Sequence, residues 1–231
     1  MMTEAMQLPL GVALEDHSQF DNFYPNNNQQ LLQGLQEFLQ HVTDTVFYIW
    51  GERGVGKTHL LQACSSSAAL SSRNVHYLDC ENPTITATDL LASIDNISLL
   101  CIDNIEAVLD QPGWQESLFH CFNHLKQQQG QVVVAAVTSP RYFKMQLEDL
   151  RSRLSWGAVY QINSLDDNDK VKVLQFRADL RGLKLSDEVA MYLLNRMPRN
   201  MKDLFQVLQS LDDASMAAQR AITIPFVKHV F

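Results

Sequence analysis

The sequence predicts a three-layer α/β fold, in which helices cover both faces of a parallel sheet, followed by a small all-helical subdomain. Three observations support this prediction. Short runs that are apolar on both faces recur along residues 46–162. Helical patterns separate these runs, and the alternation of buried strands with helices is typical of a covered parallel sheet. After about residue 165 only helical patterns remain.

The five predicted strands are five to eight residues long and carry apolar residues on both faces. They are residues 46–50, 75–79, 99–103, 131–138 and 158–162. The predicted helices are residues 28–41, a short one from 88, 114–128, 166–181, 186–197 and 200–218, with a last short helix capped by Thr223. We therefore expect a mobile segment at 1–19, an α/β domain at 20–164 and a helical lid at 165–231.

Composition argues against several classes of protein. The chain has 231 residues and a net charge of −8, which argues against a broad surface for tracking DNA or RNA phosphates. No apolar run has the length of a membrane span and the amino terminus lacks a signal-peptide pattern, so we expect a cytoplasmic protein without membrane contact. Four cysteines lie far apart without a C-x-x-C pair, which indicates buried free thiols rather than a zinc site.

The strongest motif is G-E-R-G-V-G-K-T at residues 51–58, which follows a predicted strand and opens a predicted helix. This spelling and context are typical of a phosphate-binding loop. The glycines let backbone N–H groups turn inward around a polyphosphate, and the helix start adds donors. We expect Lys57 to bind the β- and γ-phosphates and the Thr58 hydroxyl to ligate Mg²⁺. The nucleotide contacts predicted here are Gly51, Gly54, Val55, Gly56, Lys57, Thr58 and His59.

A carboxylate at the same sheet edge completes the predicted site. Asp103 ends an apolar strand, so it emerges at the carboxyl edge that carries the phosphate loop and can hold Mg²⁺ through water. A capping or turn role is the structural alternative. The next residue is Asn104, whose amide cannot accept a proton, and Glu106 is expected to point elsewhere. We therefore expect a site that binds nucleotide but turns it over slowly.

Arg153 belongs to the stretch R-S-R-L-S-W-G at residues 151–157, which closes a helix and leads into the fifth strand. In a fold of this class that edge faces a neighbouring subunit. An arginine there can stabilise transition-state charge on a nucleotide held by the partner. Taken alone, the residue also suits a helix C-terminal arginine that interacts with the helix dipole.

Together these motifs resemble the AAA+ ATPase domain of the bacterial replication initiator DnaA, over roughly residues 18–231. The resemblance implies a P-loop NTPase fold with ADP or ATP and Mg²⁺ as cofactors. It also implies that Arg153 is an arginine finger that acts in trans. The further site residues that it implies are Phe20 and Phe23 in the adenine pocket, Thr138 as the sensor of the γ-phosphate, and Lys202 as the second sensor, where the family has arginine.

Two departures from DnaA narrow the resemblance. The chain shows no helix-turn-helix segment, and it carries Q-L-P-L at residues 7–10, which is similar to a short peptide that binds the sliding clamp. Both features resemble DnaA-like regulators that dock on the DNA-loaded clamp and promote hydrolysis of DnaA-bound ATP. The residues expected to bind the clamp are Gln7, Leu8, Pro9 and Leu10.

The implied function is negative regulation of DNA replication initiation. The implied partners are DnaA and the sliding clamp of DNA polymerase III, with DNA reached through the clamp. A homo-oligomer through AAA+ interfaces is also expected.

Two other functions fit the same motifs. One is an autonomous AAA+ ATPase that loads replication proteins, and rapid hydrolysis by the isolated chain would favour it. The other is a DnaA-type fold that serves only as an adaptor between proteins. Without the family context, the Q-L-P-L segment reads as a disordered tail.

Overall fold

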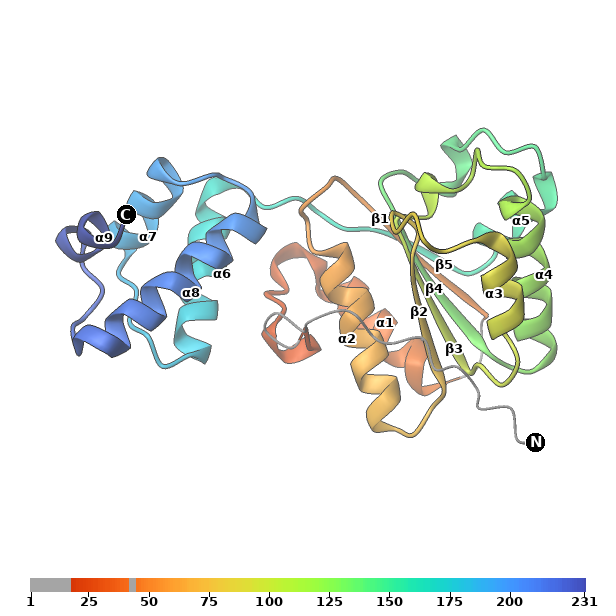
Figure 1. The fold of residues 1–231 in the computed structure, drawn as a ribbon, viewed down its shortest axis with the longest axis horizontal. Coiled ribbons are helices and arrows are strands. Elements are labelled where there is room, and N and C mark those ends of the chain that lie inside the picture. The colour runs from red at the N-terminus through yellow and green to blue at the C-terminus, as the bar shows by residue number, and fades with distance from the viewer. Residues whose placement is uncertain (1–17, 42–44) are drawn as a thin grey trace.

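The structure is a computed structural model of the chain, and it describes residues 18–41 and 45–231. The clamp-binding peptide predicted at residues 7–10 lies outside the described residues. The described chain forms an α/β domain and a helical lid beside it, joined through an extended segment after the last strand (Figure 1).

A five-stranded parallel sheet forms the centre of the α/β domain, with strand order β2-β3-β4-β1-β5. Its strands are β1 (Val46–Trp50), β2 (Val75–Asp79), β3 (Leu99–Asp103), β4 (Gln131–Ala136) and β5 (Ala158–Gln161). The predicted three-layer α/β fold is therefore confirmed.

The fourth strand is shorter than predicted, because it ends at Ala136 and not at Thr138. The register explains the difference. The last pair between β1 and β4 joins Trp50 to Ala136, and β1 then gives way to the phosphate loop. Val137 and Thr138 therefore form a bend although their side chains favour strands.

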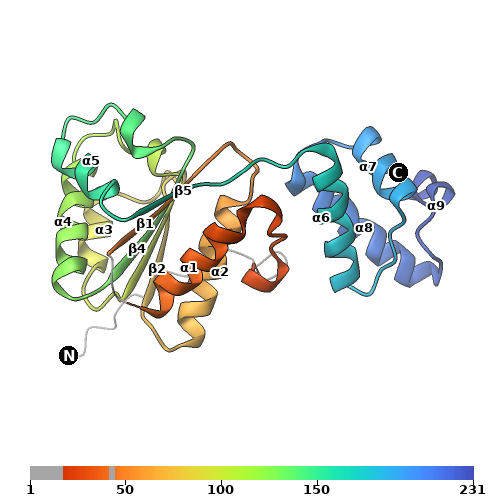
Figure 2. The ribbon, with the colours of Figure 1, turned by 180° about the vertical axis from the view of Figure 1, so that it is seen from behind.

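Helices cover both faces of the sheet (Figures 1 and 2). One face is covered by α1 (Gln29–Gln40) and α2 (Lys57–Leu70), and the other by α3 (Ala87–Ser93), α4 (Trp114–Gln127) and α5 (Glu148–Leu154). Alternate residues of β1 reach the two layers: Phe47 and Ile49 pack in the cluster with α1 and α2, and Tyr48 packs in the cluster with α4. Burial on both faces explains why the strand sequence is continuously apolar.

The lid consists of α6 (Asp167–Leu180), α7 (Asp187–Arg196), α8 (Met201–Ala218) and α9 (Ile224–Val230). It has a hydrophobic core of its own. Each helix begins after a residue whose side chain accepts a hydrogen bond from a backbone N–H of the first turn, which is the expected N-cap chemistry. These capping residues are Asp166, Ser186, Asn200 and Thr223.

Polar contacts join the lid and its connecting segment to residues 22–28 of the α/β domain. The Asn26 side-chain amide donates to Asp169 at 2.8 Å, and the Asn163 backbone N–H donates to the Asn28 side chain at 2.8 Å. Arg177 of α6 donates to the Asn22 carbonyl at 3.2 Å. The short segment before α1 therefore orients the lid against the nucleotide-binding domain.

All four cysteines are buried and free, as the sequence predicts. They are Cys64, Cys80, Cys101 and Cys121. Among residues 18–41 and 45–231, no helix combines the length and the apolar character needed to cross a membrane.

Gly157, at the turn into β5, tests how closely the chain packs against the start of β1. A Cβ atom there would lie 1.6 Å from the Val46 carbonyl oxygen, so Gly157→Ala must displace the start of β1. We expect the free energy of unfolding to fall by about 3 kcal/mol or more in urea titrations. The control is Gly113→Ala, which has a φ of 79° but open space around its Cβ, and it should cost only about 1–2 kcal/mol. Equal losses would contradict the packing argument.

Candidate functional site

The phosphate loop connects the end of β1 to the start of α2. Gly54 and Gly56 have φ values of 81° and 103°, in the left-handed region that favours glycine. Gly51 is required for a different reason, since a Cβ atom there would lie 2.5 Å from the Ile162 side chain. The loop therefore needs its glycines both for conformation and for close packing.

Lys57 begins α2 and is only 6% exposed. Its ammonium group donates to the carbonyl oxygens of Gly51 and Glu52, both at 2.8 Å. Burial lowers the pKa of Lys57, and the nearby carboxylates of Glu106 and Asp103 partly oppose that shift. The positive charge is thus held inside the loop, where a polyphosphate would meet it.

Asp103 is 1% exposed at the end of β3. Its carboxylate accepts hydrogen bonds from the Tyr77 hydroxyl at 2.9 Å and from the Asn104 backbone N–H at 3.0 Å. Burial raises the pKa of Asp103, while hydrogen bonds from Thr58 and Tyr77 act in the opposite direction. The structure therefore brings Asp103 and Thr58 together at one edge of the sheet, as a shared Mg²⁺ site requires.

Glu106 differs from the sequence-based expectation that it points elsewhere. Both carboxylate oxygens are buried, and the charge of Glu106 influences Lys57 more strongly than Asp103 does. Asn104 explains the difference: its φ of 54° turns the chain, and its amide donates to Asp79 at 3.1 Å, away from the loop. Glu106 is therefore a second acidic group near Lys57, besides Asp103, and burial raises its pKa.

The described residues fit an Mg²⁺ ion that is held together with a nucleotide. Within the described part of the chain, no three His, Cys, Asp or Glu side chains gather so that they could hold a metal ion by themselves. Mg²⁺ in nucleotide sites keeps several waters and takes few protein ligands besides the phosphates. The Thr58 hydroxyl and the Asp103 carboxylate suit this mode of binding.

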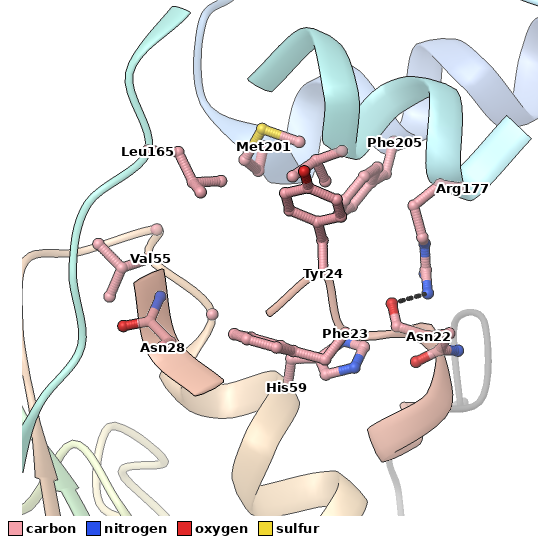
Figure 3. Close-up of a pocket in the computed structure, with 13 residues that line it drawn as sticks. Asn22, Phe23, Tyr24, Asn28, Val55, His59, Leu165, Arg177, Met201 and Phe205 are labelled. Carbon is pink, nitrogen blue, oxygen red and sulfur yellow. Dashed lines mark hydrogen bonds between the residues drawn. The ribbon is translucent and has the colours of Figure 1, made fainter. Parts of the chain in front are cut away.

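A pocket opens between the phosphate loop and the lid (Figure 3). From the α/β domain, Phe23 and His59 lie with their ring centroids 5.5 Å apart. From the lid side, Leu165 and Phe205 face the pocket (Figure 3). Flat aromatic and apolar walls beside a phosphate loop suit a nucleobase.

Several predicted residues lie in this pocket and others do not. Phe23, Val55 and His59 line it, whereas Phe20 is not among the lining residues and packs against the core beside α1 and α2. Phe20 opens a short 3-10 turn that packs on α2, whereas Phe23 follows that turn in extended conformation. The pocket residues that the sequence analysis missed are Asn22, Tyr24, Asn28, Leu165, Val173, Arg177, Met201 and Phe205.

Arg177 is the most informative of the missed residues. It is buried in α6, donates to the Asn22 carbonyl, and lies 4.9 Å from the centre of the Phe205 ring. A sequence signal exists, because Arg177 follows the buried Val173 and Leu174 at helical spacing and so falls on the apolar face. A buried arginine at such a position needs polar partners.

The two predicted sensors are not among the residues that line the pocket. Thr138 lies beyond the end of β4, and its backbone carbonyl accepts a hydrogen bond from the Tyr48 hydroxyl at 3.0 Å. Lys202 is exposed in the first turn of α8 and is not among the residues that line the pocket, whereas its neighbour Met201 is.

Arg153 lies far from the phosphate loop. It is in the last turn of α5 and borders a hollow together with Val46 and Gly157. Val46 begins β1, whereas the phosphate loop follows the other end of that strand. Arg153 and Lys57 therefore lie near opposite ends of the parallel strands.

The phosphate loop, the strand-end aspartate, the five-stranded parallel sheet and the helical lid define a P-loop nucleotide-binding protein of the AAA+ class. Comparisons with known proteins identify the family. Residues 14–161 match the bacterial DnaA ATPase domain, and residues 167–231 match the lid domain of Hda. The chain therefore belongs to the DnaA family, as an Hda-like AAA+ protein.

The chain is also similar to a protein of Haemophilus influenzae, and it shares its fold with several solved structures. An uncharacterized protein of Haemophilus influenzae is 40% identical over 225 residues, which cover 97% of each chain. Domain III of Thermotoga maritima DnaA aligns with a TM-score of 0.77 and 19% identity, over 95% of this chain and 98% of that one. AMPPCP-bound DnaA from Aquifex aeolicus aligns with a TM-score of 0.72 and 23% identity, over 86% of this chain and 66% of that one. The Thermotoga maritima motor RuvB has the same fold. It aligns with a TM-score of 0.66 and 18% identity, over 92% of this chain and 72% of that one.

Asp103→Asn tests the cost of the buried carboxylate. Because the native pKa of Asp103 is raised, the native protein keeps a proton that the unfolded chain releases, and stability falls as pH rises between the two pKa values. The Asp103→Asn variant lacks this loss. In urea titrations from pH 4 to 7 without nucleotide, its stability relative to the parent should therefore increase with pH. Asp110→Asn, at an exposed carboxylate, controls for net charge. A pH-independent difference would contradict the prediction.

Proposed function

We propose that this protein is a negative regulator of DNA replication initiation that binds the sliding clamp and stimulates hydrolysis of ATP held by DnaA. Its own nucleotide, ADP or ATP with Mg²⁺, would stabilise the arrangement of the lid. The observation that carries the proposal is the separation of Arg153 from the protein's own phosphate loop.

The length of β1 sets this separation. A five-residue strand spans about 16 Å, and the phosphate loop and Arg153 lie near its opposite ends. Arg153 therefore suits a nucleotide held by a neighbouring molecule rather than the nucleotide bound by Lys57. An arginine supplied in trans accelerates hydrolysis in several nucleotide-dependent switches. Its natural target is the ATP of a related AAA+ protein, which would be DnaA.

The protein's own site favours binding over turnover. The residue after Asp103 is Asn104, and its amide is engaged with Asp79 and cannot act as a general base. The pocket formed by Phe23, His59 and Phe205 suits adenine. The AMPPCP complex of Aquifex aeolicus DnaA, which has the same fold, supports an adenine nucleotide. Lys57 would hold its phosphates, and Mg²⁺, bound between Thr58 and Asp103, would neutralise phosphate charge.

Clamp binding would supply the location of the regulator. The segment Gln7-Leu8-Pro9-Leu10 combines an amide, two apolar side chains and a proline that would favour an extended bound peptide, which suits docking of a short linear motif. Its partner would be the sliding clamp of DNA polymerase III, and DNA would be reached through that clamp in the cytoplasm. The Arg153 edge would also support a homo-oligomer.

Arg153→Ala tests the trans-acting role. In a reaction with clamp loaded on DNA, ATP-bound DnaA and this protein, stimulated phosphate release should fall by about 10³-fold, because the transition state loses its added positive charge. The measurement is single-turnover hydrolysis of DnaA-bound ATP. Arg151→Ala, on the same helix but ion-paired with Glu148, is the matched control and should retain stimulation. Full stimulation by the Arg153→Ala variant would refute the finger.

The tether is tested by replacing Leu8 and Leu10 together with alanine. Two apolar side chains lost from clamp pockets should weaken affinity for the clamp by about tenfold or more, as measured by surface plasmon resonance. Thr3→Ala, outside the tetrapeptide, should bind as the parent does. Unchanged affinity of the double variant would show that the clamp is recognised elsewhere or not at all.

A further inference from the structure

Arg153 lies near two aromatic side chains. Its guanidinium carbon is 4.8 Å from the centre of the Trp156 ring and 5.9 Å from the centre of the Phe119 ring. The Lys126 ammonium group lies 4.2 Å from the same indole. Aromatic faces attract cations at these distances through their quadrupole. The side chain is therefore held against a surface before any partner arrives.

The backbone places the indole beside Arg153. Helix α5 ends at Leu154, and the Trp156 backbone N–H donates to the Arg153 carbonyl at 3.2 Å, which folds the chain back over the helix end. Gly157 then packs directly against the Val46 carbonyl, so the turn cannot slide along the sheet. The backbone of Trp156 is thus fixed by its neighbours in the chain.

Helix α4 supplies the other two members of the cluster. Phe119 and Lys126 are seven residues apart, so they share one face of the helix at a separation of two turns. Helices α4 and α5 pack against each other on the same face of the sheet (Figure 1). The cluster therefore joins two rigid elements rather than lying on a flexible loop.

The exposure of Trp156 argues against a role in the core. Its side chain is 68% exposed, and it belongs to none of the three hydrophobic clusters of the described chain. The indole borders a hollow that also contains both cations. The residues that line this hollow are Thr45, Val46, Phe122, Lys126, Arg153, Trp156 and Gly157.

We infer that Trp156 is the positioning residue of Arg153. A free arginine side chain samples many rotamers, and an arginine finger that must be ordered during the reaction loses that entropy in the transition state. The indole restricts the guanidinium beforehand, while Lys126 and Phe119 hold the cluster from α4. This inference rests on the proposed function for its consequence in catalysis, but the contact itself belongs to the isolated chain.

The contact is tested first, without any partner. The chain contains three tryptophans, so a sample labelled with ¹⁵N should give three indole N–H signals, and Trp156→Phe assigns one of them. Arg153→Ala should shift the Trp156 signal, whereas Ser152→Ala, at an exposed neighbour, should leave it in place. An unshifted signal in the Arg153→Ala variant would overturn the inference even if the proposed function is correct.

The catalytic consequence is tested in the reconstituted reaction. Trp156→Ala should lower kcat for stimulated hydrolysis about tenfold with unchanged KM for ATP-bound DnaA, and Trp156→Phe should restore most of it. A higher KM with unchanged kcat would make the ring a docking residue and refute positioning. Parental kinetics in the alanine variant would also refute it. The Arg153→Ala variant is measured in the same reaction. If it loses stimulation, the proposed function holds and the Trp156 results test positioning alone.

Discussion

The constraint on which the structure depends is the parallel pairing of β1 with β4 on one side and β5 on the other. Because of this pairing, the phosphate loop lies at the carboxyl ends of the strands and the end of α5 lies near their amino ends. Lys57 and Arg153 are therefore separated by the whole length of a central strand. This separation is what the proposed action of Arg153 on a nucleotide held by another molecule requires.

The nucleotide pocket is shared between the α/β domain and the lid. Residues 22–28 contact the lid through Asn22 and Asn26, and Phe23 and Tyr24 of the same segment line the pocket. A base bound there would touch both the α/β domain and the lid, so the ligand would bind best to one arrangement of the two. We therefore expect nucleotide binding to be coupled to the position of the lid.

The strands, the phosphate loop and Asp103 could be predicted from the sequence, because each depends on residues that are adjacent in the chain. The lid side of the pocket could not, since Arg177 and Phe205 meet Phe23 only after the lid packs on a segment about 150 residues away. Glu106 was misplaced for a local reason, because the left-handed Asn104 turns the chain back toward Lys57. Packing across the chain and single unusual backbone angles are therefore what the pattern of residues does not reveal.

The most direct test of the central claim asks whose triphosphate is cleaved. DnaA is loaded with ATP labelled in its γ-phosphate, this protein is loaded with unlabelled ADP, and the two are mixed with clamp on DNA. The account predicts rapid release of labelled phosphate while the ADP of this protein stays bound and unchanged. Labelled phosphate released no faster than from DnaA alone, with this protein fully loaded, would contradict it.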